Sequence, residues 1–115
     1  MTSERGFRVS VDTNAYELGC NIIEKTIEHK LVQAVKAVGG IAPKFVSPGY
    51  SGMPDRIVLL PGGKIAFVEV KATGNKPRPL QLHRHETLRR LGFNVYILDD
   101  AADIVPMLME IGGEP

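Results

Sequence analysis

The chain has 115 residues, 43% of them hydrophobic and 23% charged, with a formal net charge of +1. This composition is typical of one soluble domain that buries its own core, and the near-neutral charge excludes binding to nucleic acid through overall positive charge. Cys20 is the only cysteine and no apolar run is long enough for a membrane span or signal peptide, so we expect a cytoplasmic protein without a membrane partner.

The N-terminal residues carry little pattern, and "GFRVSVD" within them is compatible with a short strand or with a loosely packed extension. We therefore expect an N-terminal extension, 1–20, and one domain, 21–115. From Asn21 to Val38 the apolar residues recur at helical spacing, which predicts an amphipathic helix that ends at the following Gly-Gly pair. The next segment, "KFVS", predicts a first short strand, and "PGYSGMP" predicts a loop.

Two strand-like runs follow, "DRIVLL" and "IAFVEVKA", and the short turn "PGGK" between them predicts an antiparallel hairpin. After the basic loop "TGNKPRP", Pro79 can occupy the first turn of a helix that ends near Leu91. "FNVYILD" predicts another strand, and "AADIVPMLMEI" predicts a final helix with Pro106 near its first turn. The order α-β-β-β-α-β-α predicts an α/β fold with a mixed central sheet flanked by helices.

Charged residues interrupt the hairpin at positions where burial is expected. Because side chains on a strand alternate between faces, Glu69 and Lys71 share one face. Asp55 joins them only if it lies opposite Glu69, which requires Leu60 to pair with Lys64 across a three-residue loop. A two-residue loop would turn Asp55 to the other face. We therefore expect the three-residue loop or a bulge near Asp55.

Two carboxylates on one face repel each other unless a positive charge lies between them. Lys71 could supply that charge in a structural ion network at a sheet edge. A divalent cation, Mg²⁺ or Mn²⁺, could do so better, with Asp55, Glu69 and the carbonyl oxygen of Val70 as ligands. Lys71 could then orient a water molecule or offset charge on a phosphate. The short pattern by itself leaves both interpretations open.

The residues "PD" at Pro54-Asp55, followed by "EVK" at 69–71, resemble the PD-(D/E)XK nuclease superfamily. More narrowly, the segments "IEHKLVQAVKAVGG", "KFVSPGYSGMPDRIVLLPGGKIAFVEVKA" and "KPRPLQLHRHETLRRLGFNVYILDD" together resemble the stand-alone VRR-NUC domain of phages and bacteria. The resemblance implies a restriction-endonuclease-like core that hydrolyses phosphodiester bonds in DNA with the help of a divalent metal ion. It also implies a homodimer that selects branched or flapped DNA, including four-way (Holliday) junctions.

The resemblance implies roles for five side chains. The metal-binding acids of the family fall on Asp55 and Glu69, its lysine on Lys71, and its glutamine on Gln81 at the start of the second helix. At that position free N–H groups can face a phosphate. The family also has a glutamate on its first helix, which we assign to Glu28.

Glu24 is the competing choice for the acid of the first helix. On a helical wheel Glu24 lies nearer the centre of the apolar stripe, whereas Glu28 lies at its edge. We expect Glu28 to reach the sheet, because an edge position allows it and because the family spacing favours it.

Basic residues near these acids could bind the phosphate backbone of DNA. The candidates are Lys44, Arg56, Lys76 and Arg78, and Tyr50 could either stack on a base or pack within its own loop. The three histidines lack the spacing of a zinc site. Two alternatives to an enzyme stay open: a non-catalytic module with the same fold that binds DNA or positions a partner, and a structural domain with an ion network.

Overall fold

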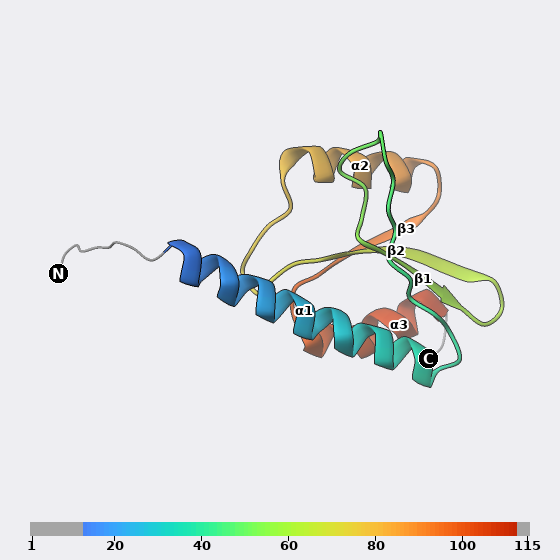
Figure 1. Ribbon diagram of the computed structural model, residues 1–115. Coiled ribbons are helices and arrows are strands. Elements are labelled where there is room, and N and C mark those ends of the chain that lie inside the picture. Colours follow the sequence, from blue (N-terminus) through green and yellow to red (C-terminus); the bar gives the residue numbers. More distant parts are fainter. Residues whose placement is uncertain (1–12, 113–115) are drawn as a thin grey trace.

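Three helices pack on the two faces of a three-stranded sheet in the computed structural model, which describes residues 13–112 (Figure 1). β2 is the central strand, antiparallel to β1 and parallel to β3. This arrangement confirms the predicted α/β fold with a mixed central sheet. In chain order the elements are α1 (Thr13–Ala37), β1 (Arg56–Leu60), β2 (Lys64–Val70), α2 (Pro79–Arg90), β3 (Asn94–Leu98), a 3-10 turn (Ala101–Asp103) and α3 (Ile104–Gly112).

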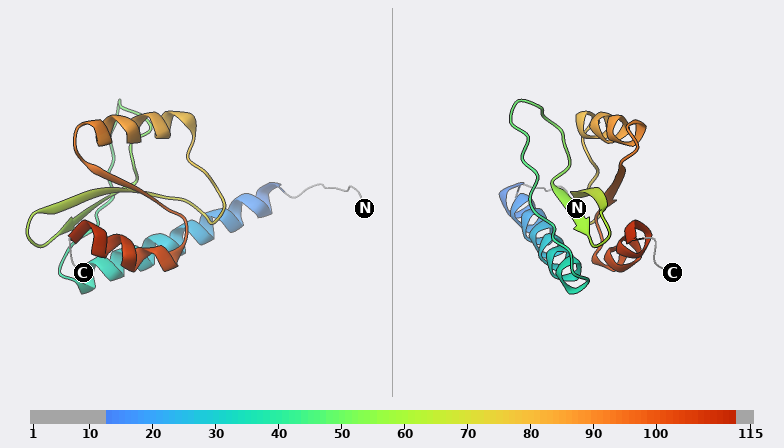
Figure 2. Two further views of the ribbon diagram at one scale, coloured as in Figure 1. Left: turned by 180° about the vertical axis from the view of Figure 1, so that it is seen from behind. Right: turned by 90° about the vertical axis from the view of Figure 1, so that its right-hand side faces the viewer.

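The alternation of side chains along β2 separates two layers. α1 and α3 cover one face of the sheet, and α2 covers the other (Figures 1 and 2). Val68 and Val70 lie in the larger core with buried residues of α1 and α3. Phe67 lies in a smaller apolar cluster with Leu88 of α2. Because successive residues of a strand point to opposite faces, Glu69 points toward α2 and away from the larger core.

α1 begins earlier than the apolar pattern predicts, at Thr13 rather than at Asn21. The helix therefore runs across the boundary expected at residue 20, and its N-terminal part projects beyond the sheet (Figure 1). Leu18 and Ile22 on this projecting part are exposed, which explains why they do not extend the buried stripe. The possible strand "GFRVSVD" lies outside the described residues. None of the helices in 13–112 has the length and apolar character needed to cross a membrane.

The predicted end of the first helix is confirmed, and it is fixed to the hairpin. α1 ends at Ala37, and Gly39 has a φ of 88°, a left-handed conformation that glycine adopts without strain. Gly40 passes so close to β1 that an added Cβ would lie 2.3 Å from the carbonyl oxygen of Leu59. The chain can therefore turn from α1 to the sheet edge only with a glycine at this position.

The segment Lys44–Ser47, which the pattern predicts to be a strand, forms no regular strand. Its neighbourhood pairs with β1 through isolated bridges: the N–H of Ile57 donates to the carbonyl of Pro43 at 3.1 Å, and the N–H of Phe45 donates to the carbonyl of Asp55 at 2.7 Å. Pro43 has no N–H to donate, so the ladder is interrupted in its middle. The segment still holds Asp55 against the edge of the sheet.

The hairpin has the register that brings the two acids together. Leu60 pairs with Lys64 across the loop 61–63, which confirms the three-residue loop. Both glycines of this loop have positive φ values, 87° and 76°, which explains the Gly-Gly sequence. Continued by one residue, the same register places Asp55 opposite Glu69 on the face of α2.

The elements after the hairpin follow the sequence pattern closely. α2 begins at Pro79, ends at Arg90 and is followed by Gly92 with a φ of 98°. β3 lies within the predicted "FNVYILD", and α3 carries Pro106 in its first turn. The parallel pairing of β3 with β2 follows from the helical crossover through α2.

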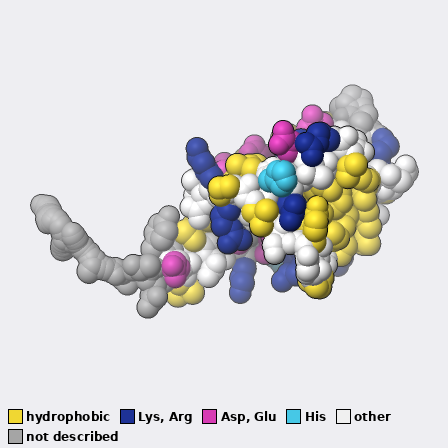
Figure 3. All heavy atoms as spheres, turned by 90° about the horizontal axis from the view of Figure 1, so that it is seen from above, with side chains coloured by type: hydrophobic (Ala, Val, Ile, Leu, Met, Phe, Trp, Pro, Cys, Tyr) yellow, Lys and Arg dark blue, Asp and Glu magenta, His cyan; other side chains and the backbone are white. Residues whose placement is uncertain are grey.

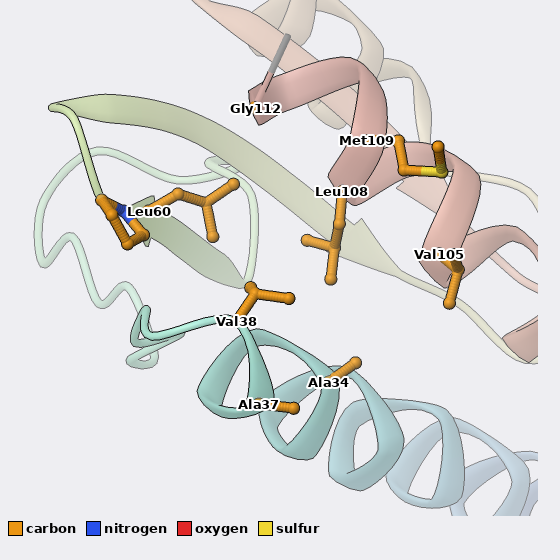
Figure 4. Close-up of a pocket in the computed structure, with 9 residues that line it drawn as sticks. Ala34, Ala37, Val38, Leu60, Val105, Leu108, Met109 and Gly112 are labelled. Carbon is orange, nitrogen blue, oxygen red and sulfur yellow. The ribbon is translucent and has the colours of Figure 1, made fainter. Parts of the chain in front are cut away.

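An apolar hollow of about 500 Å³ lies on the opposite side of the molecule from α2, between α1, the hairpin loop and α3 (Figure 4). None of its lining side chains is titratable, so it offers no group for acid–base or metal chemistry. The hollow is lined by Ala34, Ala37, Val38, Leu60, Pro61, Val105, Leu108, Met109 and Gly112.

Candidate active site

Four polar side chains meet where the end of β2 faces the first turn of α2. The Asp55 carboxylate accepts a hydrogen bond from the backbone N–H of Val70 at 3.0 Å, which ties it across the hairpin. Glu69 accepts a hydrogen bond from Gln81 at 2.8 Å, and the Lys71 ammonium lies 3.6 Å from the same Glu69 oxygen. The structure therefore brings together two acids, one amine and one amide that the sequence singled out separately.

Glu69 is almost completely buried, with 1% of its surface exposed. Its Oε2 atom faces Gln81 and Lys71, whereas its Oε1 atom has no hydrogen-bond partner within the described part of the chain. Burial raises the pKa of this carboxyl group from 4.5 to about 7, the Asp55 carboxylate adds to the rise, and the Lys71 ammonium opposes it. The protein alone therefore stabilises the Glu69 carboxylate incompletely, and a further cation would stabilise it.

The first turn of α2 fixes the amide of Gln81. Its Oε1 atom accepts a hydrogen bond at 2.8 Å from the backbone N–H of Arg78, the residue that precedes the helix. The amide nitrogen must then point the other way, toward Glu69, where it donates its hydrogen bond. The glutamine that ends the sequence "PRPLQ" thus caps the helix and contacts the acid cluster at once.

Glu28, which we expected to be the helix acid of the site, is bound by an arginine. Nε of Arg56 donates to Oε2 of Glu28 at 3.2 Å, and Nη1 of Arg56 donates to the carbonyl of Ala42 at 2.8 Å. Both side chains are mostly buried. The pair joins α1 to the sheet edge, and each charge is largely satisfied by the other.

Glu24 lies closer to the acid cluster than its position on the helical wheel indicates. Burial raises the pKa of its carboxyl group, the carboxylates of Asp55 and Glu28 add to the rise, and the Lys71 ammonium and the backbone N–H of Ala72 oppose it. These neighbours place Glu24 just beyond the end of β2.

His85 was missed as a site residue by the sequence reasoning, which weighed the histidines only as zinc ligands. It is fully buried, and its Nε2 atom lies 3.6 Å from Oε1 of Glu69. Neither ring nitrogen has a hydrogen-bond partner among the described residues. Burial lowers the pKa of the imidazole, and Arg89 lowers it further. The available signal was its spacing of four residues from Gln81, which puts both side chains on one helix face.

The predicted DNA-binding residues fall into two groups. The exposed group consists of Lys44, Lys76, Arg78 and Tyr50. Arg56 is instead mostly buried and forms an ion pair with Glu28. Figure 3 views the molecule from the side of α2 and shows several lysine and arginine side chains on this face. The exposed residues thus remain candidates for phosphate contacts.

Arg84 of α2 holds the loop that carries Tyr50. Its guanidinium lies 3.9 Å from the centre of the Tyr50 ring, and its Nε donates to the carbonyl of Ser51 at 2.7 Å. Gly52, with a φ of 88°, brings the same loop against Leu80. The loop before the acids and the start of α2 therefore form one continuous surface beside the site.

The donor set fits a hard divalent cation. Among residues 13–112 no three His, Cys, Asp or Glu side chains are grouped closely enough to hold a metal ion by themselves. Asp55 and Glu69 offer two carboxylates, and Mg²⁺ commonly takes only one or two carboxylates, with waters and phosphate oxygens as its other ligands. The unpartnered buried Oε1 of Glu69 and the repulsion between the two acids both favour an added positive charge.

This mixed sheet between helices, with Asp, Glu and Lys at the end of the hairpin, defines a nuclease domain of the restriction-endonuclease-like class. A solved structure described as "VRR_NUC domain" is 35% identical, with a TM-score of 0.70, and the match covers 74% of this chain and 92% of that one. The protein "Putative nuclease p44" of Acyrthosiphon pisum secondary endosymbiont phage 1 is 55% identical over 87 residues, 74% of this chain and 94% of that protein. No family model matches the chain. The chain belongs to the VRR-NUC family, as the sequence resemblance predicted.

Proposed function

We propose that this chain is a divalent-metal-dependent DNA endonuclease that hydrolyses phosphodiester bonds in branched DNA, such as Holliday junctions. One observation carries the proposal: the hairpin register puts Asp55 and Glu69 on one face, with Lys71 beside them. The family and the phage relative named as a nuclease support the nuclease part of this proposal.

Asp55, Glu69 and the carbonyl oxygen of Val70 are the residues that would hold Mg²⁺ or Mn²⁺. When bound, the ion would supply Lewis acidity and would lower the pKa of a water molecule toward neutral pH. Lys71 holds its ammonium at the edge of the site, where it orients the attacking water and offsets charge on the phosphate. Gln81 fixes the Glu69 carboxylate through its hydrogen bond and helps to position that water.

For the acid of the first helix we propose Glu24 in place of Glu28. The Glu24 carboxylate lies beside Asp55 and Lys71, whereas Glu28 is bound to Arg56. A third carboxylate near the ion could accept hydrogen bonds from the waters around it. The ion pair of Glu28 and Arg56 instead anchors α1, which carries Glu24, to the sheet.

We place the DNA backbone along the face of α2 and the preceding loop. The exposed cations Lys44, Lys76 and Arg78 contact phosphates there, and Tyr50 offers an aromatic ring to an unpaired base. Arg56 is not part of this surface, because its guanidinium is engaged inside the fold.

A homodimer would place two active sites on one branched substrate, since each chain has one. Apolar residues are exposed on the projecting part of α1, at Leu18, Ile22 and Ile23, and such a face is suited to a second copy of the chain. Light scattering coupled to size exclusion should give about twice the mass of 12.6 kDa. Leu18→Glu combined with Ile22→Glu should give a monomer.

The decisive experiment is a cleavage assay on four-way, flapped and linear DNA with Mg²⁺, Mn²⁺ or EDTA. We expect cleavage of branched DNA with either ion, none with EDTA, and none by Asp55→Ala. Asp103→Ala, an exposed acid of the turn before α3, is the matched control and should cut like the wild type. Binding of branched DNA without cleavage under all conditions would instead support the alternative, a non-catalytic module that binds DNA.

A further inference from the structure

Two side chains of α2 face the two oxygens of the buried Glu69 carboxylate. Gln81 donates to Oε2 at 2.8 Å, and His85, one helical turn later, places Nε2 3.6 Å from Oε1. The amide of Gln81 is itself fixed by the backbone of Arg78. The helix thus approaches both oxygens of one carboxylate. Gln81 forms a hydrogen bond to Oε2, whereas His85 lies slightly too far from Oε1 to form one.

Oε1 of Glu69 and Nε2 of His85 face each other, and neither has another hydrogen-bond partner among the described residues. Oε1 of Glu69 and both ring nitrogens of His85 are buried, and none has a hydrogen-bond partner within residues 13–112. Burying unpaired polar atoms costs free energy, and an apolar side chain of similar size would avoid the cost. A separation of 3.6 Å exceeds a hydrogen bond, but catalytic hydrogen bonds are often long before the bound partners arrive.

We propose that His85 is a positioning residue for Glu69, donating Nε2–H to Oε1 while Gln81 donates to Oε2, so that α2 fixes the carboxylate toward the divalent ion. This inference rests on the proposed function. Each carboxylate oxygen has two lone pairs, so an oxygen held by a donor can still bind an ion. Groups that orient a metal-binding side chain typically change metal affinity or activity about 10- to 100-fold.

The test compares two substitutions of His85 that differ in hydrogen bonding. Leu fills the site without a donor, and Gln retains an amide N–H near the place of Nε2. We expect His85→Leu to keep or raise the melting temperature, to weaken Mn²⁺ binding about 10-fold and to lower kcat 10- to 100-fold. KM for DNA should not change. His85→Gln should recover most of both losses. His29→Leu, an exposed histidine of α1 away from the proposed DNA surface, is the matched control and should behave like the wild type.

A histidine with only a packing role gives a different result. If His85→Leu binds Mn²⁺ and cuts DNA like the wild type, or if His85→Gln loses as much as His85→Leu, the proposal is wrong. Should His85→Leu fail to fold, His85→Gln alone tests the proposal. Mn²⁺ affinity and kcat close to the wild-type values support it, and a loss of both contradicts it.

A crystal structure of the folded variant gives a readout that does not depend on activity. We expect the Glu69 carboxylate to be rotated or disordered without the donor and ordered as in the wild type with Gln at position 85. An unchanged Glu69 in His85→Leu would overturn the proposal. If the wild type fails to cut DNA with any ion, the proposed function fails, while the Glu69 conformation still tests the role of His85.

Discussion

Replacing Glu69 by Gln should stabilise the metal-free protein while abolishing its cleavage of DNA. Gln has the shape of the protonated acid, and its carbonyl oxygen can accept the hydrogen bond from Gln81 that Oε2 now accepts. Its amide nitrogen can donate to Nε2 of His85 when the imidazole carries its proton on Nδ1 instead. The substitution therefore removes a buried charge without leaving a new unpaired group.

The size of the effect follows from the pKa of Glu69. The folded-state pKa of about 7 lies above the ordinary value of 4.5, so the folded protein binds this proton more tightly than the unfolded chain does. The resulting stabilisation is complete below pH 4.5 and is lost as the pH rises through 7. At about 1.4 kcal/mol per pKa unit, the wild type loses at most about 3.5 kcal/mol from this group by pH 8.

Urea unfolding of both proteins in EDTA, from pH 4.5 to pH 8, measures this difference. The two free energies of unfolding should nearly coincide at pH 4.5, and the variant should be the more stable by about 2–3 kcal/mol at pH 8. Comparing the two proteins cancels the other titrating groups. A variant that is equally stable or less stable at pH 8 would show that the Glu69 carboxylate is not destabilised by its surroundings.

Four further substitutions separate the site from the scaffold. Gly40→Ala should lower the free energy of unfolding by more than about 2 kcal/mol, because the new Cβ would lie 2.3 Å from the carbonyl oxygen of Leu59; urea unfolding measures it. Gly19→Ala on α1 meets no atom within 4 Å and should be neutral or stabilising by up to about 1 kcal/mol. Glu24→Gln should lower kcat about 10-fold or more without lowering stability, because burial raises the pKa of the Glu24 carboxyl group. Glu28→Gln should mainly lower stability and leave kcat nearly unchanged. If Glu28→Gln lowers kcat and Glu24→Gln does not, Glu28 is the helix acid after all.

Much of the site could be predicted because local chemistry determines it. The loop 61–63 needs two glycines for its positive φ values, which fixes its length and hence the register. The register in turn decides that Asp55 faces Glu69. Gln81 was assigned from the family resemblance, and its place in the first turn after Pro79 is local in sequence. Each of these steps involves residues close in sequence or paired across one turn.

The parts that could not be predicted depend on contacts distant in sequence. A helical wheel gives the direction of Glu24 and Glu28 but not where the sheet ends along α1. Arg56 looks like a phosphate contact until its partner on α1 is known. His85 belongs to no sequence motif, and only its position opposite Glu69 in the fold identifies it as a site residue. The roles of these residues therefore depend on contacts in the folded protein and not on the local sequence pattern.

Anomalous diffraction from crystals grown with Mn²⁺ is the most direct measurement of the central claim, that two carboxylates of the hairpin share one ion. We predict one strong peak within about 2.5 Å of oxygens from both Asp55 and Glu69, with the carbonyl of Val70 as a further ligand. The peak should disappear in Asp55→Ala crystals. A protein that cuts DNA while its Mn²⁺ lies elsewhere, away from both carboxylates, would contradict the account.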